Sequence, residues 1–405
     1  MKAALGLLAV LAACAAWASA DLAPGVRFKI GPADLPAPHA TPSVSNGAIP
    51  VPRPADAQLR VPPGFEARLF AANLSHPRWL AVAPNGDVLL AESSAGKLTL
   101  LRDADGDGRP ELVTSFVDGL ARPHGMAFHG DWLYVADTER VWRIPYRAGD
   151  TRARARPEAV TADGALGPGS GHWTRNVVVD PAGRHLYVAI GSRGNIAEEP
   201  LPRATIQRFL LDGSGQASFA LGLRNPIGIA FHPATGRLWT VVNERDGLGD
   251  GLVPDYLAEV VEGAHYGWPH AYLGGHLDPR YGRERPDIVA RARAPELWFV
   301  SHSAPIGLAF YDGAMFPPEY RGDAFVALQG SWNSAKPVGY MLARVPFKDG
   351  RPLGHYESFA TGFWVAGSET ARVIGKPAGV AVARDGALLV ADDVGRALWR
   401  ISYRP

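Results

Sequence analysis

The sequence has a single cysteine among its 405 residues, Cys14, close to the N-terminus. If the first 20 residues are removed, the remaining chain has no thiol for a disulfide, a thiolate metal site or covalent attachment of haem. Lys and Arg number 41 and Asp and Glu 40, so the chain lacks the net basic field that nucleic-acid-binding proteins usually carry. After residue 20, no apolar run approaches the roughly 18 residues of a membrane-spanning helix. These absences argue against a nucleic-acid partner and a membrane-spanning body.

Residues 1–20 have the features of a secretory signal. Lys2 provides a positive start, residues 3–13 form a short apolar core, and small residues at positions 18–20 precede a cleavage point. The stretch that ends at Cys14 also resembles a bacterial lipoprotein signal, in which the cysteine is lipidated after cleavage. Both interpretations predict export, as a free periplasmic or secreted protein or as one with a lipid anchor at Cys14.

Two regions of different texture follow. Residues 21–60 are rich in Pro and Ala and have little periodicity, so we expect an extended leader that wraps or tethers the body. From residue 61 onward one pattern occurs six times: an apolar quartet, a turn that contains glycine, and a second apolar strand. The quartets begin at Trp79, Gly125, Asn176, Gly228, Gly307 and Gly379.

These repeats predict the fold. Short apolar strands cannot bury themselves alone, but small sheets arranged around an axis bury both faces of each copy. We therefore predict an all-β fold, a six-bladed β-propeller over residues 61–405, in which a strand at residues 65–72 completes the last blade. The longer fourth and fifth copies predict insertions at residues 248–303 and 311–322, as loops over one face. A β-sandwich whose strands match by chance is the alternative.

A basic or hydrogen-bonding side chain stands at or just before the start of each quartet. In a propeller the first strand of each blade lines the central channel, so we expect these side chains at one mouth of it. Such a set suits a compact polyanion. The alternative is that the side chains bond backbone carbonyls and stabilise turns. The residues are Arg78, His124, His172 with Arg175, Arg224 with Asn225, His302, and Lys376.

His172 differs from the others because it follows a glycine-rich loop at residues 167–171, which would let the imidazole project into the cavity. An unperturbed imidazole has a pKa of about 6.5, so a neutral ring that can accept a proton is available at neutral pH. His172 is therefore the candidate general base.

Two stretches have the oxygen-rich composition that a hard cation prefers. Residues 243–250 follow the second strand of the fourth copy and offer carboxylates and turn carbonyls to calcium. Residues 103–108 resemble the first half of a calcium loop, but Thr114 occupies the closing position, where a bidentate Glu would be needed. We expect a hairpin turn there, with a weak calcium site as the alternative.

Six motifs together resemble the soluble quinoprotein family of glucose and sorbosone dehydrogenases, most closely the sorbosone branch, over roughly residues 60–403. The resemblance implies a six-bladed propeller that uses pyrroloquinoline quinone (PQQ) and calcium to oxidise a sugar or alcohol by hydride transfer. It also implies a separate electron acceptor such as a cytochrome or a quinone. The motifs are Gly171-His172-Trp173-Thr174-Arg175-Asn176, Leu223-Arg224-Asn225-Pro226, Val242-Asn243-Glu244-Arg245-Asp246, Tyr266-Gly267-Trp268-Pro269, Gly330-Ser331-Trp332-Asn333, and Gly375-Lys376-Pro377 with Ala391-Asp392-Asp393-Val394-Gly395.

The resemblance also implies roles for individual residues. His172 matches the catalytic base, and Arg224 and Asn225 match the quinone-binding pair, with Arg224 also expected to polarise the quinone carbonyl. Lys376 matches a basic contact to the cofactor, and Arg175 and His302 belong to the expected cofactor-binding set.

The cation site follows from the same resemblance. The turn at Glu244 and Arg245 matches the backbone carbonyls that bind calcium, with Asp246 assisting. Two positions depart from the family pattern: Gln329, which we include in the cofactor-binding set, stands where a basic residue or His is expected, and Ser334 stands where Arg is usual.

Two other classes of function stay open at this point. Lactonases of propeller form hold calcium on the channel axis through carboxylates and Asn, whereas the residues expected at this mouth are mainly basic. A non-catalytic binding propeller would have no need of a proton acceptor such as His172.

Overall fold

The computed structural model describes residues 23–404. The expected signal at residues 1–20, with Cys14, lies outside these described residues. Regular structure in the described range is nearly all β-strand, accompanied by one α-helix, α2 (Pro286–Arg291), and three short 3-10 helices. The all-β prediction is therefore confirmed. None of the described helices is long and apolar enough to cross a membrane.

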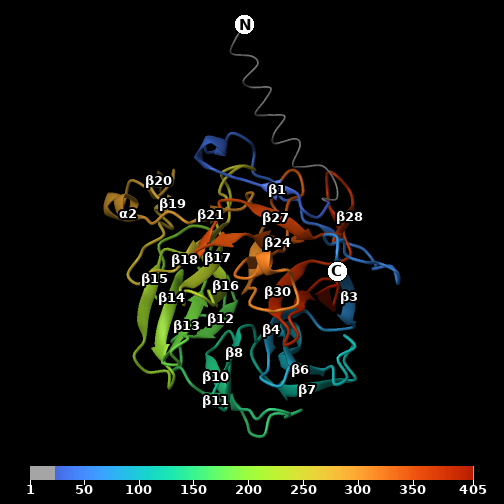
Figure 1. Ribbon diagram of the computed structural model, residues 1–405. Helices are drawn as coiled ribbons and strands as arrows, with labels where there is room; N and C mark the ends of the chain where they lie inside the picture. The colour runs from blue at the N-terminus through green and yellow to red at the C-terminus, as the bar shows by residue number, and fades with distance from the viewer. Residues whose placement is uncertain (1–22, 405) are drawn as a thin grey trace.

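Six antiparallel sheets of four or five strands follow one another along the described chain (Figure 1). In each sheet the strand with the apolar quartet lies at one edge. The first sheet contains β4 (Pro77–Val82), β5 (Val88–Glu92), β6 (Lys97–Arg102) and β7 (Leu112–Asp118). The second contains β8 (Met126–His129), β9 (Trp132–Ala136), β10 (Val141–Pro145) and β11 (Glu158–Ala159). The third contains β12 (Arg175–Val179), β13 (His185–Ile190), β14 (Thr205–Leu210) and β15 (Ala217–Leu221).

The other three sheets take strands from more distant parts of the chain. The fourth contains β16 (Asn225–Phe231), β17 (Leu238–Asn243), β18 (Tyr256–Glu259) and β21 (Leu297–Trp298). The fifth contains β22 (Pro305–Phe310), β23 (Ala324–Leu328), β24 (Met341–Val345), β27 (Tyr356–Ala360) and, from the N-terminal segment, β1 (Arg27–Phe28). The sixth contains β30 (Pro377–Val382), β31 (Leu388–Asp392), β32 (Ala397–Tyr403) and β3 (Phe65–Ala71).

Three small sheets accompany these six in the described range. They pair β2 (Ile49–Pro50) with β29 (Arg372–Val373) and β28 (Trp364–Ala366), β19 (Ala271–Tyr272) with β20 (His276–Leu277), and β25 (Phe347–Lys348) with β26 (Arg351–Pro352). The expected insertion at residues 248–303 is only partly loop. It supplies β18, β21 and α2, because the fourth sheet draws its two outer strands from this stretch.

The sixth sheet is completed by the strand that precedes the first repeat, which joins the last strand of the chain. β3 pairs with β32 in antiparallel register, with Phe65 opposite Tyr403 and Ala67 opposite Ile401. This confirms that the strand expected near residues 65–72 completes the last sheet. The pairing covers the edge of β32 that would otherwise be open to other chains.

Buried apolar side chains lie between consecutive sheets. One cluster contains Leu100 of β6 and Leu133 of β9, between the first and second sheets. Another contains Leu389 of β31 and Leu90 of β5, so the last sheet packs on the first. Similar clusters lie between the other neighbouring sheets. The sheets therefore bury both faces in a closed ring.

Glycine at the start of a quartet lets the first strands meet at the centre. These strands contact one another in the cyclic order β4, β8, β12, β16, β22 and β30, and β30 contacts β4 again. A Cβ on Gly307 of β22 would lie 2.1 Å from the carbonyl oxygen of Ala378 in β30, and one on Gly379 would lie 2.4 Å from that of Arg78 in β4. No side chain fits at that distance, which explains why these repeats begin with glycine.

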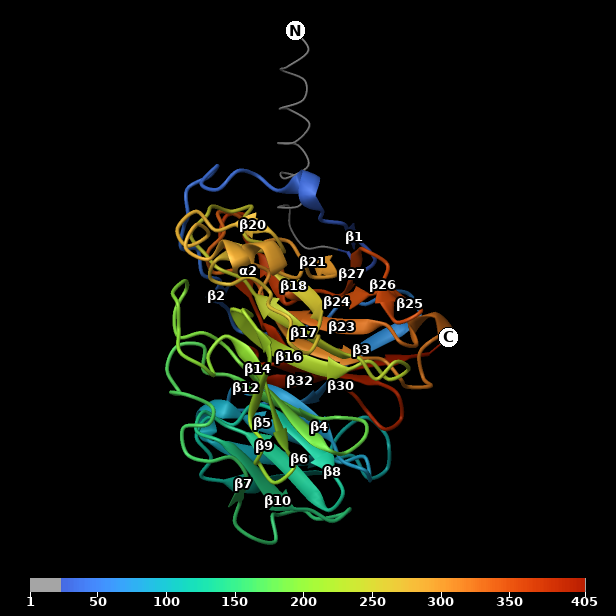
Figure 2. The same ribbon diagram turned by 90° about the vertical axis from the view of Figure 1, so that its left-hand side faces the viewer.

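The N-terminal segment, residues 24–60, runs along the outside of the ring, where it is seen in blue in Figure 2. It adds β1 to the edge of the fifth sheet and pairs β2 in parallel with β29. Between these two strands the segment has little regular structure and crosses the loops that form the site.

Candidate active site

The predicted site residues lie where the first strands of the sheets begin. Arg175 and Asn225 are the first residues of β12 and β16, Lys376 directly precedes β30, and His302 lies shortly before β22. Because the sheets share one topology, these starting points gather at one end of the ring, which we call the site end.

The His172 ring is held in one tautomer by a serine. Its Nδ1 lies 2.9 Å from Ser192 Oγ, and that hydroxyl donates its own hydrogen to the carbonyl of Gly194 at 2.7 Å. The hydroxyl must therefore accept from Nδ1–H, so Nε2 is the unprotonated nitrogen. Among the described residues Nε2 has no hydrogen-bond partner. Burial, and then the charge of Arg224, lower the pKa of His172 to about 3. The ring is therefore neutral at pH 7, and its free lone pair is on Nε2.

Arg224 is buried and all five of its N–H groups have acceptors. Nε donates to the carbonyl of Asn195 at 3.0 Å, and Nη1 donates to the carbonyls of Asn243 at 3.2 Å and Glu244 at 2.7 Å. Nη2 donates to Asn195 Oδ1 and to Asp246 Oδ2, each at 3.0 Å. The guanidinium is rigidly placed, and contact with a ligand requires one of these acceptors to be exchanged.

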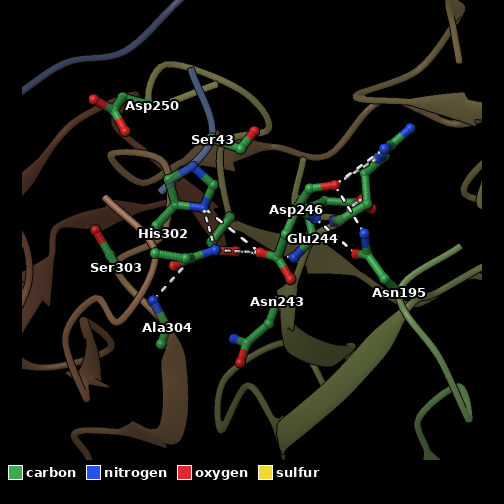
Figure 3. A network of polar contacts seen from close by, with 12 residues as sticks. Ser43, Asn195, Asn243, Glu244, Asp246, Asp250, His302, Ser303 and Ala304 are labelled. Atoms are coloured by element: carbon green, nitrogen blue, oxygen red, sulfur yellow. Dashed lines mark hydrogen bonds and ion pairs between the residues drawn. The ribbon is translucent and has the colours of Figure 1, made fainter. Parts of the chain in front are cut away.

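Asp246 links Arg224 to His302, and Figure 3 shows Asp246 beside His302. Its Oδ1 accepts a hydrogen bond from Asn333 Nδ2 and lies 3.7 Å from His302 Nδ1. The other ring nitrogen of His302 lies 3.1 Å from the carbonyl of Gly249. Burial lowers the pKa of His302, but the contact with Asp246 and the charge of Asp255 outweigh it and the pKa is raised.

The turn expected to bind calcium is rich in buried oxygen. Glu244 is buried, its Oε1 has no partner among the described residues, and burial raises its pKa to about 7. Asp255 accepts from the backbone N of Glu244 at 2.9 Å, and burial raises its pKa to about 6. The carbonyls of Glu244 and Asp246 accept from Arg224 and Arg245. An oxygen-only set with buried carboxylates suits a hard cation such as calcium.

A second cluster lies at the starts of the sixth and first sheets. Asp393 accepts hydrogen bonds from Arg78 and from Gln329. The side-chain amide of Gln329, which departs from the family pattern, is therefore bound to a carboxylate. Lys376 Nζ lies 5.2 Å from the ring centroid of Tyr340, and burial lowers the pKa of Lys376. No ion pair of Lys376 is found among the described residues, so its ammonium has hydrogen-bonding capacity for an anion.

Trp173 places an aromatic face among these cations. The guanidinium of Arg122 lies 4.1 Å from its ring centroid, that of Arg78 lies 5.5 Å away, and the ring of His124 lies at 5.8 Å, edge to face. A flat, negatively charged ligand finds both stacking and charge at such a place.

Several buried polar atoms at the site end lack a partner in the described part of the chain. Because a buried polar group without a hydrogen bond is costly, a concentration of such atoms indicates a place where a ligand supplies the missing partners. The atoms are His76 Nδ1, Arg78 Nε, His124 Nδ1, Asn225 Oδ1, Glu244 Oε1 and Asp393 Oδ1. A polyanionic quinone and a hard cation fit this mixture of donors and acceptors.

Arg175 has a different position from the one the sequence suggested. It is fully buried, and its guanidinium donates to the carbonyls of Pro168, His172 and Thr174. It fixes the glycine-rich loop in front of His172 and does not face a ligand. Arg203, which sequence reasoning passed over, donates to the carbonyls of Pro168 and other residues of the same loop.

Other contributors were also missed. Asn195 and Asp255 lie in stretches without a repeated pattern, and no signal in the sequence marks them. His76 and Arg122 each precede a quartet by a few residues, so a wider window before each repeat would have included them. Asn333 belongs to the Gly-Ser-Trp-Asn motif, between Gln329 and Ser334, and the motif itself is the signal that could have identified it.

The acidic loop of the first sheet folds as a turn that is stabilised by its own carboxylates. Asp103 accepts from the backbone N of Gly106 and Gly108, and Glu111 accepts from that of Ala104. Oxygens of Asp103, Asp105, Asp107 and Glu111 lie within 4.8 Å of one another. The carboxylate that completes the group is Glu111, not a residue at position 114.

The comparisons with known proteins agree with this fold. The model of the TrAA12-like family matches residues 59–253 and 285–404. The fold is that of a propeller, and the predicted resemblance to soluble PQQ-dependent sugar dehydrogenases is confirmed. The chain belongs to the TrAA12-like family.

Individual relatives are distant. An uncharacterised protein of Borreliella burgdorferi is 26% identical over 356 residues, which cover 85% of this chain and 91% of that protein. A pyrroloquinoline quinone-dependent pyranose dehydrogenase of Coprinopsis cinerea is 25% identical, over 71% of this chain but only 45% of that enzyme. The PQQ domain of a Coprinopsis cinerea pyranose dehydrogenase in its holo form superposes with a TM-score of 0.71 at 19% identity, covering 89% of this chain and 100% of that domain. This last likeness concerns the fold.

Proposed function

We propose that this protein is a six-bladed propeller that binds PQQ and calcium and oxidises a hydroxyl group of a sugar or a related alcohol, aldoses and sorbosone-like compounds being the first candidates. The single observation that carries the proposal is the neutral His172, whose tautomer is fixed by Ser192 so that a bare Nε2 remains. Names of relatives support the redox class, since a pyranose dehydrogenase and a glucose dehydrogenase among them are described as quinone-dependent.

In this proposal His172 is the general base. The hydroxyl proton of the substrate moves to Nε2, while the two electrons of the C–H bond leave as hydride and the substrate becomes a carbonyl compound. When bound, the quinone supplies the hydride acceptor. Arg175 and Arg203 keep the loop of His172 in place through its carbonyls. General-base assistance of this kind contributes typically about 10² to 10⁴ in rate.

The remaining residues bind and orient. Asn225, with its unpaired Oδ1, and Lys376, with its available ammonium, would hold the quinone together with Arg78 and Trp173. Arg224 supplies a fixed positive charge and contacts the quinone if one of its five acceptors exchanges. Oxygens of residues 244–246 would hold calcium, which stabilises negative charge that develops on a nearby oxygen.

The proposal includes the location of the protein and the partner that takes up its electrons. The signal-like composition of residues 1–20 supports export to the periplasm or secretion from the cell. In the alternative form of this proposal, the exported protein has a lipid anchor at Cys14. Because the chain has no other cysteine and so no means of attaching haem covalently, electrons would leave to a separate acceptor such as a cytochrome or a quinone.

Reconstitution tests the proposed function. Purified protein without cofactor is titrated with PQQ in the presence and absence of calcium, and binding is followed by quenching of tryptophan fluorescence. The loaded protein is then screened for reduction of a dye by aldoses, sorbosone and simple alcohols. The same protein without quinone is assayed for hydrolysis of aldonolactones.

We expect calcium-dependent quinone binding and dye reduction with at least one sugar or alcohol. Hydrolysis of a lactone that needs calcium but no quinone would replace the proposal with a lactonase. A bound quinone that no substrate of the screen reduces would point to a binding protein instead.

A further inference from the structure

The N-terminal segment crosses the site end of the ring, where it contacts loops that are distant from it in the sequence. We use the name strap for residues 39–46, which have no helix or strand and are largely exposed on their outer side. The strap lies on two loops. The first, residues 246–251, follows β17, and the second, residues 331–335, follows β23. Both loops carry residues of the candidate site.

On the first loop the strap acts through two hydroxyl groups. Thr41 Oγ1 accepts from the backbone N of Asp250 at 2.8 Å, and Ser43 Oγ accepts from that of Gly249 at 3.3 Å. Pro42 lies between them and restricts the backbone to an extended shape. A Cβ on Gly249 would lie 2.7 Å from the carbonyl oxygen of Thr41, so strap and loop are in direct backbone contact.

On the second loop Asn46 binds with both its backbone and its side chain. Its backbone N donates to the carbonyl of Trp332 at 2.7 Å, and its Oδ1 accepts from Thr370 Oγ1 at 2.7 Å. A side-chain amide that bridges several carbonyls restricts the loops that carry them. Asn46 Nδ2 lies within hydrogen-bond distance of the carbonyls of Ser334 at 3.0 Å, Ala335 at 3.2 Å and Glu369 at 2.7 Å.

The two loops meet again at His302. The carbonyl of Gly249, from the first loop, lies 3.1 Å from His302 Nε2, and Asn333, from the second loop, lies 3.1 Å from His302 Nδ1. Asn333 also donates to Asp246, whose other oxygen accepts from Arg224 at 3.0 Å. The partners of both ring nitrogens are therefore carried on loops that the same strap holds.

We propose that the strap is part of the active site and that Asn46 is a positioning residue for it. Asn46 fixes the loop at 331–335, this loop places Asn333 against Asp246, and Asp246 sets the position of the Arg224 guanidinium. The proposal rests on the proposed function and deepens it, because it states that Asn46 increases the affinity for the quinone without touching the quinone.

The first test needs no quinone. In protein labelled with ¹³C-histidine, the ring resonance of His302, assigned by its absence in His302→Gln, is expected to shift and broaden in Asn46→Ala. Ser45→Ala is the matched control, because Ser45 is an exposed neighbour whose side chain makes no hydrogen bond within the described residues. Ser43→Ala, which acts on the other loop, is expected to move the same resonance and serves if Asn46→Ala does not fold. If the His302 resonance is unchanged in folded Asn46→Ala, or in Ser43→Ala where Asn46→Ala does not fold, the proposal is overturned.

The second test measures the dissociation constant of PQQ in the presence of calcium. Asn46→Ala and Asn333→Ala are each expected to raise it about tenfold, the effect of losing a net hydrogen bond or two. Because both act on Asp246 by one route, the double variant should bind no more than about threefold more weakly than either single variant. Effects that multiply, or an unchanged constant in Asn46→Ala, contradict the proposal. If the wild-type protein binds no quinone, the proposed function fails, while the His302 resonance still decides the role of the strap.

Discussion

Arg224 Nη2 lies 3.0 Å from Asp246 Oδ2, and this ion pair is one of five hydrogen bonds that engage every N–H of the guanidinium. The charge is thus fixed before any ligand arrives. Preorganised charges of this kind favour catalysis because they do not have to be reoriented during the reaction. The same completeness makes Arg224 a structural residue as well as a site residue.

Loss of the Arg224 side chain should therefore destabilise the fold. Arg224→Ala removes the buried guanidinium that donates to the Asp246 carboxylate and to the carbonyl of the buried Glu244, which costs about 3 to 5 kcal/mol of unfolding free energy. Urea unfolding of the protein without cofactor measures this. Arg208→Ala is the control, since Arg208 pairs with the exposed Glu262 and should cost less than about 1 kcal/mol. Equal costs for the two variants would show that the five-donor arrangement is not formed in solution.

Replacement of the proposed base should slow turnover and leave the cofactor in place. In His172→Gln the hydride step loses its proton acceptor, so the dye-reduction rate of the quinone-loaded variant should fall by about 10² to 10⁴. His185→Gln, in β13 of the same sheet and paired with Asp180 at its outer end, should be unaffected. Near-normal turnover of the loaded His172→Gln variant rejects His172 as the base.

The ionisation of His172 offers a test that does not need turnover. Burial, and then the charge of Arg224, lower its pKa to about 3, so its ring should remain neutral down to about pH 4 in an NMR titration without cofactor. An anion bound beside Arg224 offsets that charge and should raise the pKa. Below about pH 6.5 the unfolded chain binds a proton that the folded chain excludes, so His172 makes the fold lose stability as the pH falls toward 3. An apoprotein pKa above 5.5 would contradict the burial of the ring.

The repeats explain how much of this molecule could be predicted. Each quartet with its glycine is a local pattern, and the ring follows because a strand such as β22 can be buried only against the next copy. Positions tied to the repeat, such as Asn225 and Lys376, were therefore found at the site end.

The sequence did not predict the direction in which a side chain points or the contacts made by residues outside the repeats. Arg175 occupies a repeat position, but its donors turn to the carbonyls of its own loop, and a sequence pattern does not distinguish the two orientations. Asn46 lies in a segment without periodicity and contacts a loop almost 290 residues later in the chain. The sequence around Asn46 therefore gives no indication of that contact.

The glycines at the centre of the ring yield a prediction about stability. A Cβ on Gly307 would lie 2.1 Å from the carbonyl oxygen of Ala378, in backbone that cannot move without shifting β30. Gly307→Ala should therefore cost about 1 to 3 kcal/mol of unfolding free energy or force the two sheets apart. The control is Gly47→Ala, because a Cβ on Gly47 has no atom within 4 Å. If urea midpoints of the two variants coincide, the first strands do not approach one another as closely as the ring requires.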